Sequence, residues 1–432
     1  MTSRYALSKH PRTLWILALT ELCERFAFWG IGNLLVLYTI EYYQFSDAKA
    51  TQIYGIFAGF AAFSPLLGGW IADRWNYQSP ILLGAILNAA GCFMIGTGLS
   101  ILFYPSLFLI ALGYGIFTPS ILTVLGFTYR KYPHLREAGF SIYYASINIG
   151  VFLALASLST IVKLTSWNLA FTIAGIVQLL GLVPLIWYLI HHKETYRALK
   201  SFHAETKLQE KPLTRVEKDR MKVIFVFCAI SIIFWLTYNQ AYSSMEIFTH
   251  KFMNKAVGTW NIPEGVFLSS ESFFLILLAP TLSYLYGWLQ KKNKDPSSSK
   301  KTALSLAFIA ICFLIMTIAS SHIPKGATSA MVPYQYVIVS FFFMAIGEML
   351  LAPVGLSMIT NLVPQRYSAL AVGMWYVCVG LAYFMGGMIA SLMGRIGTLS
   401  DFFSIFVIIT MIPAIVMLFF SKKLTKMSHI DS

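Results

Sequence analysis

The stretch Glu21-Leu22-Cys23-Glu24-Arg25-Phe26-Ala27-Phe28-Trp29-Gly30 decides how this chain folds, because it places ionisable residues inside a long apolar run. On a helix, Glu21, Glu24 and Arg25 share one face, since they are spaced by three and four residues from Glu21. A charge at the centre of a membrane helix costs about 2.5–3.5 kcal/mol on insertion scales. We therefore expect this face to be buried against other helices, around a polar interior.

The charge balance of this stretch suggests a role. One guanidinium, that of Arg25, cannot balance the carboxylates of both Glu21 and Glu24, so one carboxylate has reason to carry a proton part of the time. The three residues are therefore candidates for proton coupling. The alternative is a structural Glu–Arg pair that locks a helix bundle.

The composition places the whole chain in a membrane. Of its 432 residues, 57% are hydrophobic and 12% are charged, and its mean hydropathy is +0.68. Apolar runs long enough to cross a bilayer recur along the sequence, which predicts an all-α, multi-pass membrane protein. The expected transmembrane spans are 13–40, 51–73, 79–102, 104–128, 138–162, 167–190, 222–248, 264–290, 302–321, 333–361, 367–393 and 399–421.

The basic residues predict the orientation of these spans. Most Lys and Arg residues fall in loops on the side of the N-terminus, as the positive-inside rule requires of a cytoplasmic face. We expect both termini in the cytoplasm and the protein in the cell membrane. The net charge of +14 is spread over these loops, so it does not indicate a nucleic-acid partner.

The polar segment 191–221 divides the spans into six and six. This predicts an N-terminal half at 1–190, a cytoplasmic linker at 191–221 and a C-terminal half at 222–432. A 6+6 division is typical of transporters with a substrate site between two halves, near the middle of the membrane.

A few other ionisable residues fall inside the spans. Glu271 and Glu348 lie deep in the eighth and tenth spans, whereas Glu246 lies near a span end and is expected to be solvated. An excess of buried carboxylates is relieved by protonation or by a bound cation. At the end of the second span, Asp73 and Arg74 suggest a conformational latch between helices, or an ordinary charge pair at the membrane exit.

Other chemistry finds little support in the sequence. The five cysteines fall in apolar runs without metal-ligand spacing or a disulfide framework. Motifs of hydrolases, zinc proteases and P-loop nucleotide-binding proteins do not occur. We therefore expect neither an enzyme nor a metal or organic cofactor, with protons as the coupling ion.

Several motifs together resemble one family. Glu21 to Gly30 is similar to the E-x-x-E-R-F-x-Y-Y-G signature of the proton-dependent oligopeptide transporters, within the major facilitator superfamily. Further segments resemble this family in the same order along the chain: 68–74, Tyr144 with 147–150, Phe234-Trp235 with Gln240, 277–280, 347–348, 353–357 and 373–376.

The resemblance implies a major facilitator fold of two six-helix halves and the symport of di- and tripeptides with protons. It also implies that Asn148 and Glu348 hold the peptide's amino end, with Tyr144 and Trp375 lining the pocket. Gln240 and Glu271 are further candidates for substrate contact.

The sequence also departs from the family pattern. Gly32 and Thr118 stand where many members carry an arginine and a lysine, and Ala62 and Ala352 replace a tyrosine and a serine. Glu271 stands where an asparagine is usual. The cavity has thus lost cations and gained a carboxylate, which disfavours a substrate carboxylate and favours an amine. The alternatives to peptide symport are therefore transport of another small amine-bearing solute, or a transport-inactive sensor or scaffold.

Overall fold

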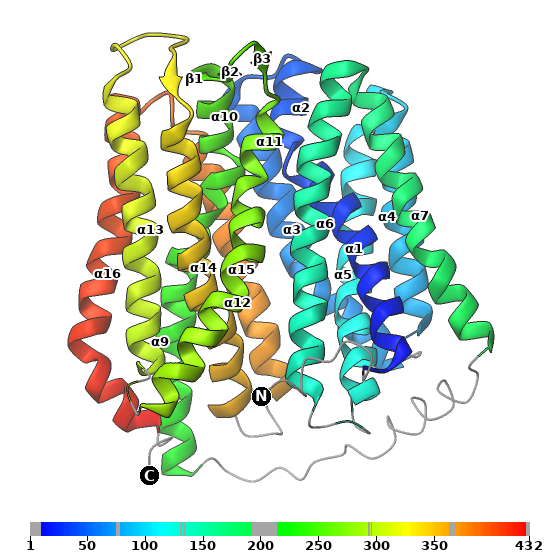
Figure 1. Ribbon diagram of the computed structural model, residues 1–432, viewed down its shortest axis with the longest axis vertical. Helices are drawn as coiled ribbons and strands as arrows, with labels where there is room; N and C mark the ends of the chain where they lie inside the picture. The colour runs from blue at the N-terminus through cyan, green and yellow to red at the C-terminus, as the bar shows by residue number, and fades with distance from the viewer. Residues whose placement is uncertain are drawn as a thin grey trace. The chain divides into compact units, whose positions relative to one another are not determined.

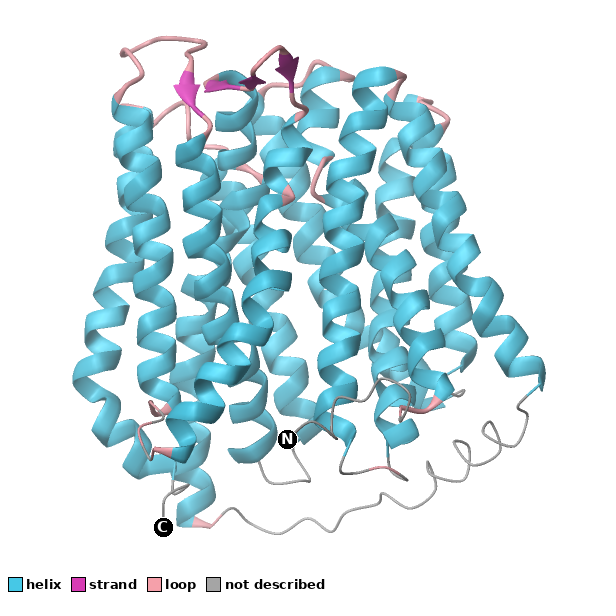
Figure 2. Ribbon diagram, viewed as in Figure 1, coloured by secondary structure: helices cyan, strands magenta, loops and turns pink. Residues whose placement is uncertain are grey.

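The computed structural model describes residues 10–74, 78–129, 132, 135–191, 214–292, 294, 296–362 and 368–428. Figure 2 shows that almost all of this described chain is helical, with two pairs of very short strands. Among the described residues, ten helices are long and apolar enough to cross a membrane, and a further helix has a shorter apolar stretch, Met374–Ala390. With the charged first helix, these correspond to the twelve predicted spans.

The chain forms two compact units, which are described separately. The first unit contains residues 1–38 and 60–207, and the second contains 39–59 and 208–432. The first part of the second predicted span therefore groups with the second unit rather than with its neighbours in the sequence. Most of the expected linker, 191–221, lies outside the described residues.

The helices that enter the first unit follow one another along the chain (Figure 1). They are α1 (Arg12–Gly32), α2 (Leu35–Glu41), α3 (Asp47–Arg74), α4 (Gln78–Gly96), α5 (Phe103–Thr128), α6 (Arg136–Leu164) and α7 (Trp167–His191), with a 3₁₀ turn at Ser100–Leu102. The α1 helix packs against α6 and α7, and α4 packs against α5 and α7. Both α2 and α3 are divided between the two units, since residues 39–59 belong to the second unit.

The first predicted span, 13–40, is not one helix. It is broken at Asn33 and Leu34, where α1 ends and α2 begins. Gly30, Gly32 and Asn33 have low helix propensity, so a break costs least at this point. The Asn33 amide still donates to the carbonyl of Trp29 over 2.9 Å, which caps α1.

The second unit contains both helices and short strands. The helices are α9 (Arg215–Tyr238), α10 (Ser244–Lys251), α11 (Glu264–Leu268), α12 (Ser270–Lys291), α13 (Ser298–Ser321), α14 (Gln335–Leu362), α15 (Ser368–Ala390) and α16 (Leu399–Ser428), with a 3₁₀ turn at Asn239–Tyr242. The strands are β1 (Met253–Asn254), β2 (Ala256–Val257), β3 (Trp260–Asn261) and β4 (Val332–Pro333). β1 pairs with β4 in parallel, and β2 pairs with β3 in an antiparallel hairpin.

A capping box explains where α9 begins. Thr214 caps α9, because its hydroxyl accepts from the Glu217 amide over 3.2 Å while the Glu217 carboxylate accepts from the Thr214 amide over 2.7 Å.

Within the second unit, α3 approaches α15 closely, since a Cβ on Gly55 would lie 2.8 Å from the Cα of Gly387. Only glycines allow two helix backbones to come this near.

Candidate functional site

The charged cluster of α1 is buried and internally paired. Glu21 and Glu24 are fully buried, and Arg25 is 4% exposed. Arg25 donates from Nε to Oε1 of Glu21 over 2.7 Å, and its Nη2 lies 2.6 Å from the same oxygen. Its Nη1 lies 3.3 Å from Oε2 of Glu24. The structure thus brings together the three residues that the sequence predicts, with one guanidinium between two carboxylates.

The α5 helix supplies further partners for the guanidinium. Arg25 donates from Nη2 to Oγ1 of Thr118 over 3.3 Å, and its Cζ lies 4.8 Å from the ring centre of Tyr114. A cation over an aromatic face is stabilised by the ring's negative face. Arg25 therefore has a neutral acceptor and an aromatic surface beside it, in addition to its two carboxylates.

The α4 helix holds Glu24 through an amide. Asn88, which is fully buried, donates from Nδ2 to Oε1 of Glu24 over 3.2 Å. The Asn88 Oδ1 in turn accepts from the thiol of Cys92 over 3.3 Å. Glu24 is therefore fixed from α4 by a group that remains neutral at every physiological pH.

Close helix packing places α6 and α7 against this cluster. A Cβ on Gly150 of α6 would lie 2.5 Å from the carbonyl oxygen of Leu22 and 3.1 Å from the Cβ of Arg25. Gly181 of α7 abuts Cys23 in the same way. Tyr143 of α6 is also buried, and its side chain interacts with that of Glu21. Glu21 therefore has a hydroxyl partner on α6 in addition to Arg25.

Two predicted substrate residues lie on α6, in the first unit. Asn148 is 7% exposed, and its Nδ2 donates to the backbone carbonyl of Tyr144 over 3.1 Å. Tyr144, one turn earlier, is partly exposed. The structure thus places both residues on one face of the same helix.

In the second unit, Glu271 is the centre of a separate polar cluster. It lies at the start of α12 and is 1% exposed. Its Oε1 accepts from the Tyr238 hydroxyl over 3.0 Å, and its Oε2 accepts from the Tyr242 hydroxyl over 3.2 Å. Its side chain also interacts directly with that of Glu348 on α14. Two carboxyl groups in contact must share a proton or a cation.

The other two predicted residues of the second unit are packed among helices. Gln240 is fully buried, and its Nε2 donates to the carbonyls of Leu236 and Gly386 over 3.2 and 3.0 Å. Its Oε1 accepts from the Ser244 hydroxyl over 2.8 Å. Trp375 is 7% exposed and packs its ring over Gly355, where a side chain would collide with it.

The remaining sequence predictions have different outcomes. The backbone of α3 reaches Arg74, but the side chains of Asp73 and Arg74 lie outside the described part of the chain, so the latch is a prediction only. The expectation that Glu246 is solvated is wrong, because it is fully buried in α10. The residues on either side of it, in the turn at Asn239–Tyr242 and in α10, are buried as well, which proximity to the end of a span does not reveal.

Sequence reasoning missed several partners. Asn88, Tyr114, Tyr238 and Tyr242 all contact the predicted carboxylates or Arg25. Asn88 gave a usable signal, since it is the one amide in the apolar stretch 81–96. The tyrosines gave none, because aromatic residues are frequent throughout the spans.

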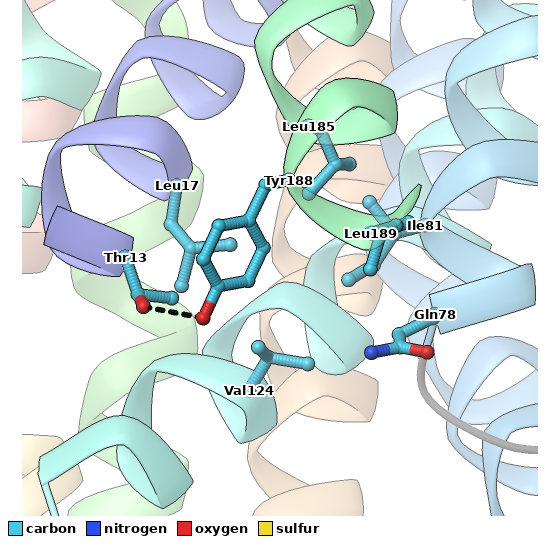
Figure 3. A pocket seen from close by; sticks show the side chains of 8 residues that line it. All are labelled: Thr13, Leu17, Gln78, Ile81, Val124, Leu185, Tyr188 and Leu189. Carbon is cyan, nitrogen blue, oxygen red and sulfur yellow. Dashed lines mark hydrogen bonds between the residues drawn. The ribbon is translucent and has the colours of Figure 1, made fainter. Parts of the chain in front are cut away.

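Figure 3 shows a small recess in the first unit. Its lining is mostly apolar and comes from α1, α4, α5 and α7: Thr13, Leu17, Gln78, Ile81, Val124, Leu185, Tyr188 and Leu189. Thr13 and Tyr188 share a hydrogen bond of 2.8 Å at its edge. None of the lining residues is one of the predicted site residues, so this recess does not correspond to the predicted site.

Comparison with known proteins extends these observations. Residues 17–333 match the profile of the Major Facilitator Superfamily. The peptide transporter YePEPT of Yersinia enterocolitica is 27% identical, over 88% of this chain and 87% of that protein. Dipeptide and tripeptide permease A of Proteus mirabilis is 24% identical, over 98% of this chain and 96% of that protein.

The crystal structure of a POT family transporter in complex with 5-aminolevulinic acid matches with a TM-score of 0.84 and 22% identity, over 98% of each chain. The major facilitator fold predicted from the sequence is thereby confirmed.

Proposed function

This chain belongs to the Major Facilitator Superfamily, and we propose that it is a proton-coupled symporter of di- and tripeptides that works by alternating access. Its similarity to a peptide transporter and to a dipeptide and tripeptide permease, along nearly the whole length of each protein, supports this substrate class. Proton-coupled transport needs no organic cofactor or metal.

The observation that carries the proposal is the pairing of Arg25 with two carboxylates in a buried site. Glu21, Glu24 and Arg25 together carry one excess negative charge when both carboxylates are ionised, and uptake of one proton neutralises it. Protonation weakens the attraction between a carboxylate and Arg25, which then relies on Thr118 and Tyr114. A proton thus alters the contacts that α1 makes with its neighbours, which is a local electrostatic switch.

We assign substrate contacts to residues of both units. Tyr144 and Asn148 act from α6, and Glu348, Glu271, Trp375 and Gln240 act from the second unit. Asn148 and Glu348 suit an α-amino group, since an amide oxygen and a carboxylate both accept hydrogen bonds. Gln240 contributes mainly through position, because its amide already joins three groups of the protein.

A second candidate substrate class is another small amine-bearing solute. The contacts made by Glu271 come from hydroxyls and from the carboxyl group of Glu348. Such a pair binds an ammonium group better than it tolerates an anion. A related fold binds 5-aminolevulinic acid, so an amine-bearing solute other than a peptide is compatible with this architecture.

The multi-pass membrane location follows from the helices and the family. We further propose that the protein lies in the cell membrane with both termini in the cytoplasm, because the basic loops gather on that side of the sequence pattern. Its partners are then the substrate, protons and the lipid bilayer. Asp73 and Arg74 remain proposed as a latch at the cytoplasmic end of α3.

The test is uptake of labelled dialanine into proteoliposomes, with and without an inward proton gradient. We expect the gradient to drive uptake by the native chain and to have no effect on Glu24→Gln, which keeps the shape and the Asn88 contact but cannot ionise. Peptide exchange without a gradient should persist in Glu24→Gln, which shows that the variant is folded. Glu217→Gln is the control and should behave as the native chain, because glutamine can still accept from the Thr214 amide in the capping box of α9.

Three results would change the proposal. Gradient-driven uptake that survives in Glu24→Gln would remove this residue from proton coupling. Flux of a non-peptide amine without any peptide flux would favour the second substrate class. No flux of either kind would favour a sensor or scaffold.

A further inference from the structure

A mixed group of metal-ligating side chains lies in the second unit and shares no residue with the buried clusters described above. Glu41 ends α2, His250 lies in the last turn of α10, and Glu264 begins α11. Each offers one ligand atom, and these three atoms lie within 4.8 Å of one another. Within the described part of the chain, this is the single group of three His, Cys, Asp or Glu residues so arranged. Glu41 is distant in sequence from the other two residues, so the fold itself brings it to them.

The spacing of these atoms fits a transition metal. His250 Nδ1 lies 3.2 Å from Glu264 Oε1 and 3.5 Å from Glu41 Oε1. Ligands at about 2.0–2.2 Å from a tetrahedral zinc ion lie about 3.3–3.5 Å apart. We propose that Glu41, His250 and Glu264 form a binding site for Zn²⁺, with water in the fourth position.

The donor types favour zinc over the abundant hard cations. Ca²⁺ and Mg²⁺ take oxygen ligands almost exclusively, whereas an imidazole nitrogen suits Zn²⁺ and its neighbours in the first transition series. The side chains of Glu41, His250 and Glu264 are 36%, 24% and 18% exposed. A hydrated ion can therefore reach them from solution.

A lysine competes for this site. Lys255 Nζ lies 2.5 Å from Glu264 Oε1 and also donates to the carbonyl of His250 over 3.0 Å. Zn²⁺ must displace this ammonium from Glu264, and the His250 carbonyl gives it a place to remain. The neighbouring Lys251–Asp47 pair is separate, with its charges 2.6 Å apart, so Asp47 is already neutralised and is not a ligand in this proposal.

If Lys255 and Zn²⁺ compete for Glu264, removing the lysine should raise the affinity for Zn²⁺. A purely structural ion pair between Lys255 and Glu264 predicts no such gain. Replacing Lys255 by methionine removes the competitor and keeps the apolar stem. We expect Lys255→Met to bind Zn²⁺ roughly fivefold more tightly, the scale of one partly exposed ion pair. An unchanged or weaker affinity in Lys255→Met would contradict the placement of the metal at Glu264.

The main experiment is calorimetric titration of ZnCl₂ into the full-length chain, purified in detergent without a histidine tag. We expect one zinc ion per chain, with binding lost in His250→Ala and weakened at least tenfold in Glu41→Gln. His322→Ala is the matched control, since His322 is an exposed histidine at the end of another helix of the same unit, and it should bind as the native chain does.

A second readout tests the donor set. Co²⁺ bound in place of Zn²⁺ should give the visible absorption of a four-coordinate site, and this should disappear in His250→Ala. No zinc binding by the native chain, or equal binding by His250→Ala, would overturn the proposal. Because these measurements need no transport, their outcome is independent of whether the chain carries peptides.

Discussion

Arg25 on α1 donates a hydrogen bond to the Thr118 hydroxyl on α5, with Nη2 and Oγ1 3.3 Å apart. Thr118 stands where the family that the sequence resembles commonly has a lysine. The structure gives the position a different role, because the hydroxyl accepts from the cation instead of adding a second one. The charged cluster thus has a neutral neighbour on α5 that stabilises Arg25 whatever the protonation of the glutamates.

Thr118→Val should weaken coupling, because valine has the same shape but cannot accept from Arg25. Hydrogen bonds to charged groups contribute about 1.5–3 kcal/mol, and a tenfold change corresponds to about 1.4 kcal/mol, so we expect gradient-driven uptake to fall by at least about tenfold. The measurement is proteoliposome uptake under a fixed proton gradient. Thr118→Ser keeps the hydroxyl and should stay near the native rate. Equal rates for the valine and serine variants would show that the hydroxyl is not used.

Asn88 should matter for stability as the neutral donor to Glu24. Asn88→Leu leaves Oε1 of Glu24 buried without this donor, and we expect a loss of about 1–3 kcal/mol in the free energy of unfolding. Asn88→Asp should be worse, since it places a third carboxylate against the cluster. Thermal unfolding in detergent measures both effects.

A double variant separates charge repulsion from misfit. In Asn88→Asp combined with Glu24→Gln, the amide and the carboxylate have exchanged helices, so much of the stability lost in Asn88→Asp should return. No recovery would mean that the Asn88→Asp substitution destabilises the chain for a reason other than its contact with Glu24.

Gly150 should tolerate no side chain, because a Cβ there would lie 2.5 Å from the Leu22 carbonyl oxygen. Gly150→Ala must push α6 away from α1, and overpacking of this kind costs about 1–3 kcal/mol. We expect a lower melting temperature together with slower uptake, since the Arg25 Cβ is the next neighbour. Gly126→Ala is the control, because the nearest atom to its Cβ would be 4.0 Å away. Equal melting temperatures for the two variants would contradict the close packing of α1 and α6.

The cluster on α1 could be predicted because its residues are neighbours in one helix and their shared face follows from helical spacing. The spans could be predicted because apolar runs and basic loops are local in the sequence. Partners on other helices could not. Asn88 of α4, Thr118 of α5 and Tyr238 of α9 reach their carboxylate or guanidinium partners only through tertiary packing.

The burial of Glu246 shows that position within an apolar run does not predict solvent exposure either. Its position near the end of an apolar run indicates water, but the run does not continue as one straight helix and the side chain is fully enclosed. Similarly, residues 39–59 group with the second unit although they precede most of the first. Hydropathy describes where a segment can lie, whereas the neighbours of a segment depend on the whole fold.

The contact between His10 and Tyr129 should make stability depend on pH at the start of α1. His10 Nδ1 and the Tyr129 hydroxyl are 2.7 Å apart, and both residues are buried. Burial lowers the pKa of His10 below its ordinary value of 6.5, so the unfolded chain binds this proton more readily than the folded chain. The free energy of unfolding therefore falls as the pH drops below 6.5, until the lowered pKa is passed.

His10→Asn keeps a polar group beside Tyr129 but cannot titrate, so its melting temperature should fall less between pH 8 and pH 5.5 than that of the native chain. The other histidines are the same in both chains and cancel in this comparison. Identical losses would show that His10 is protonated as easily in the folded chain as in the unfolded one.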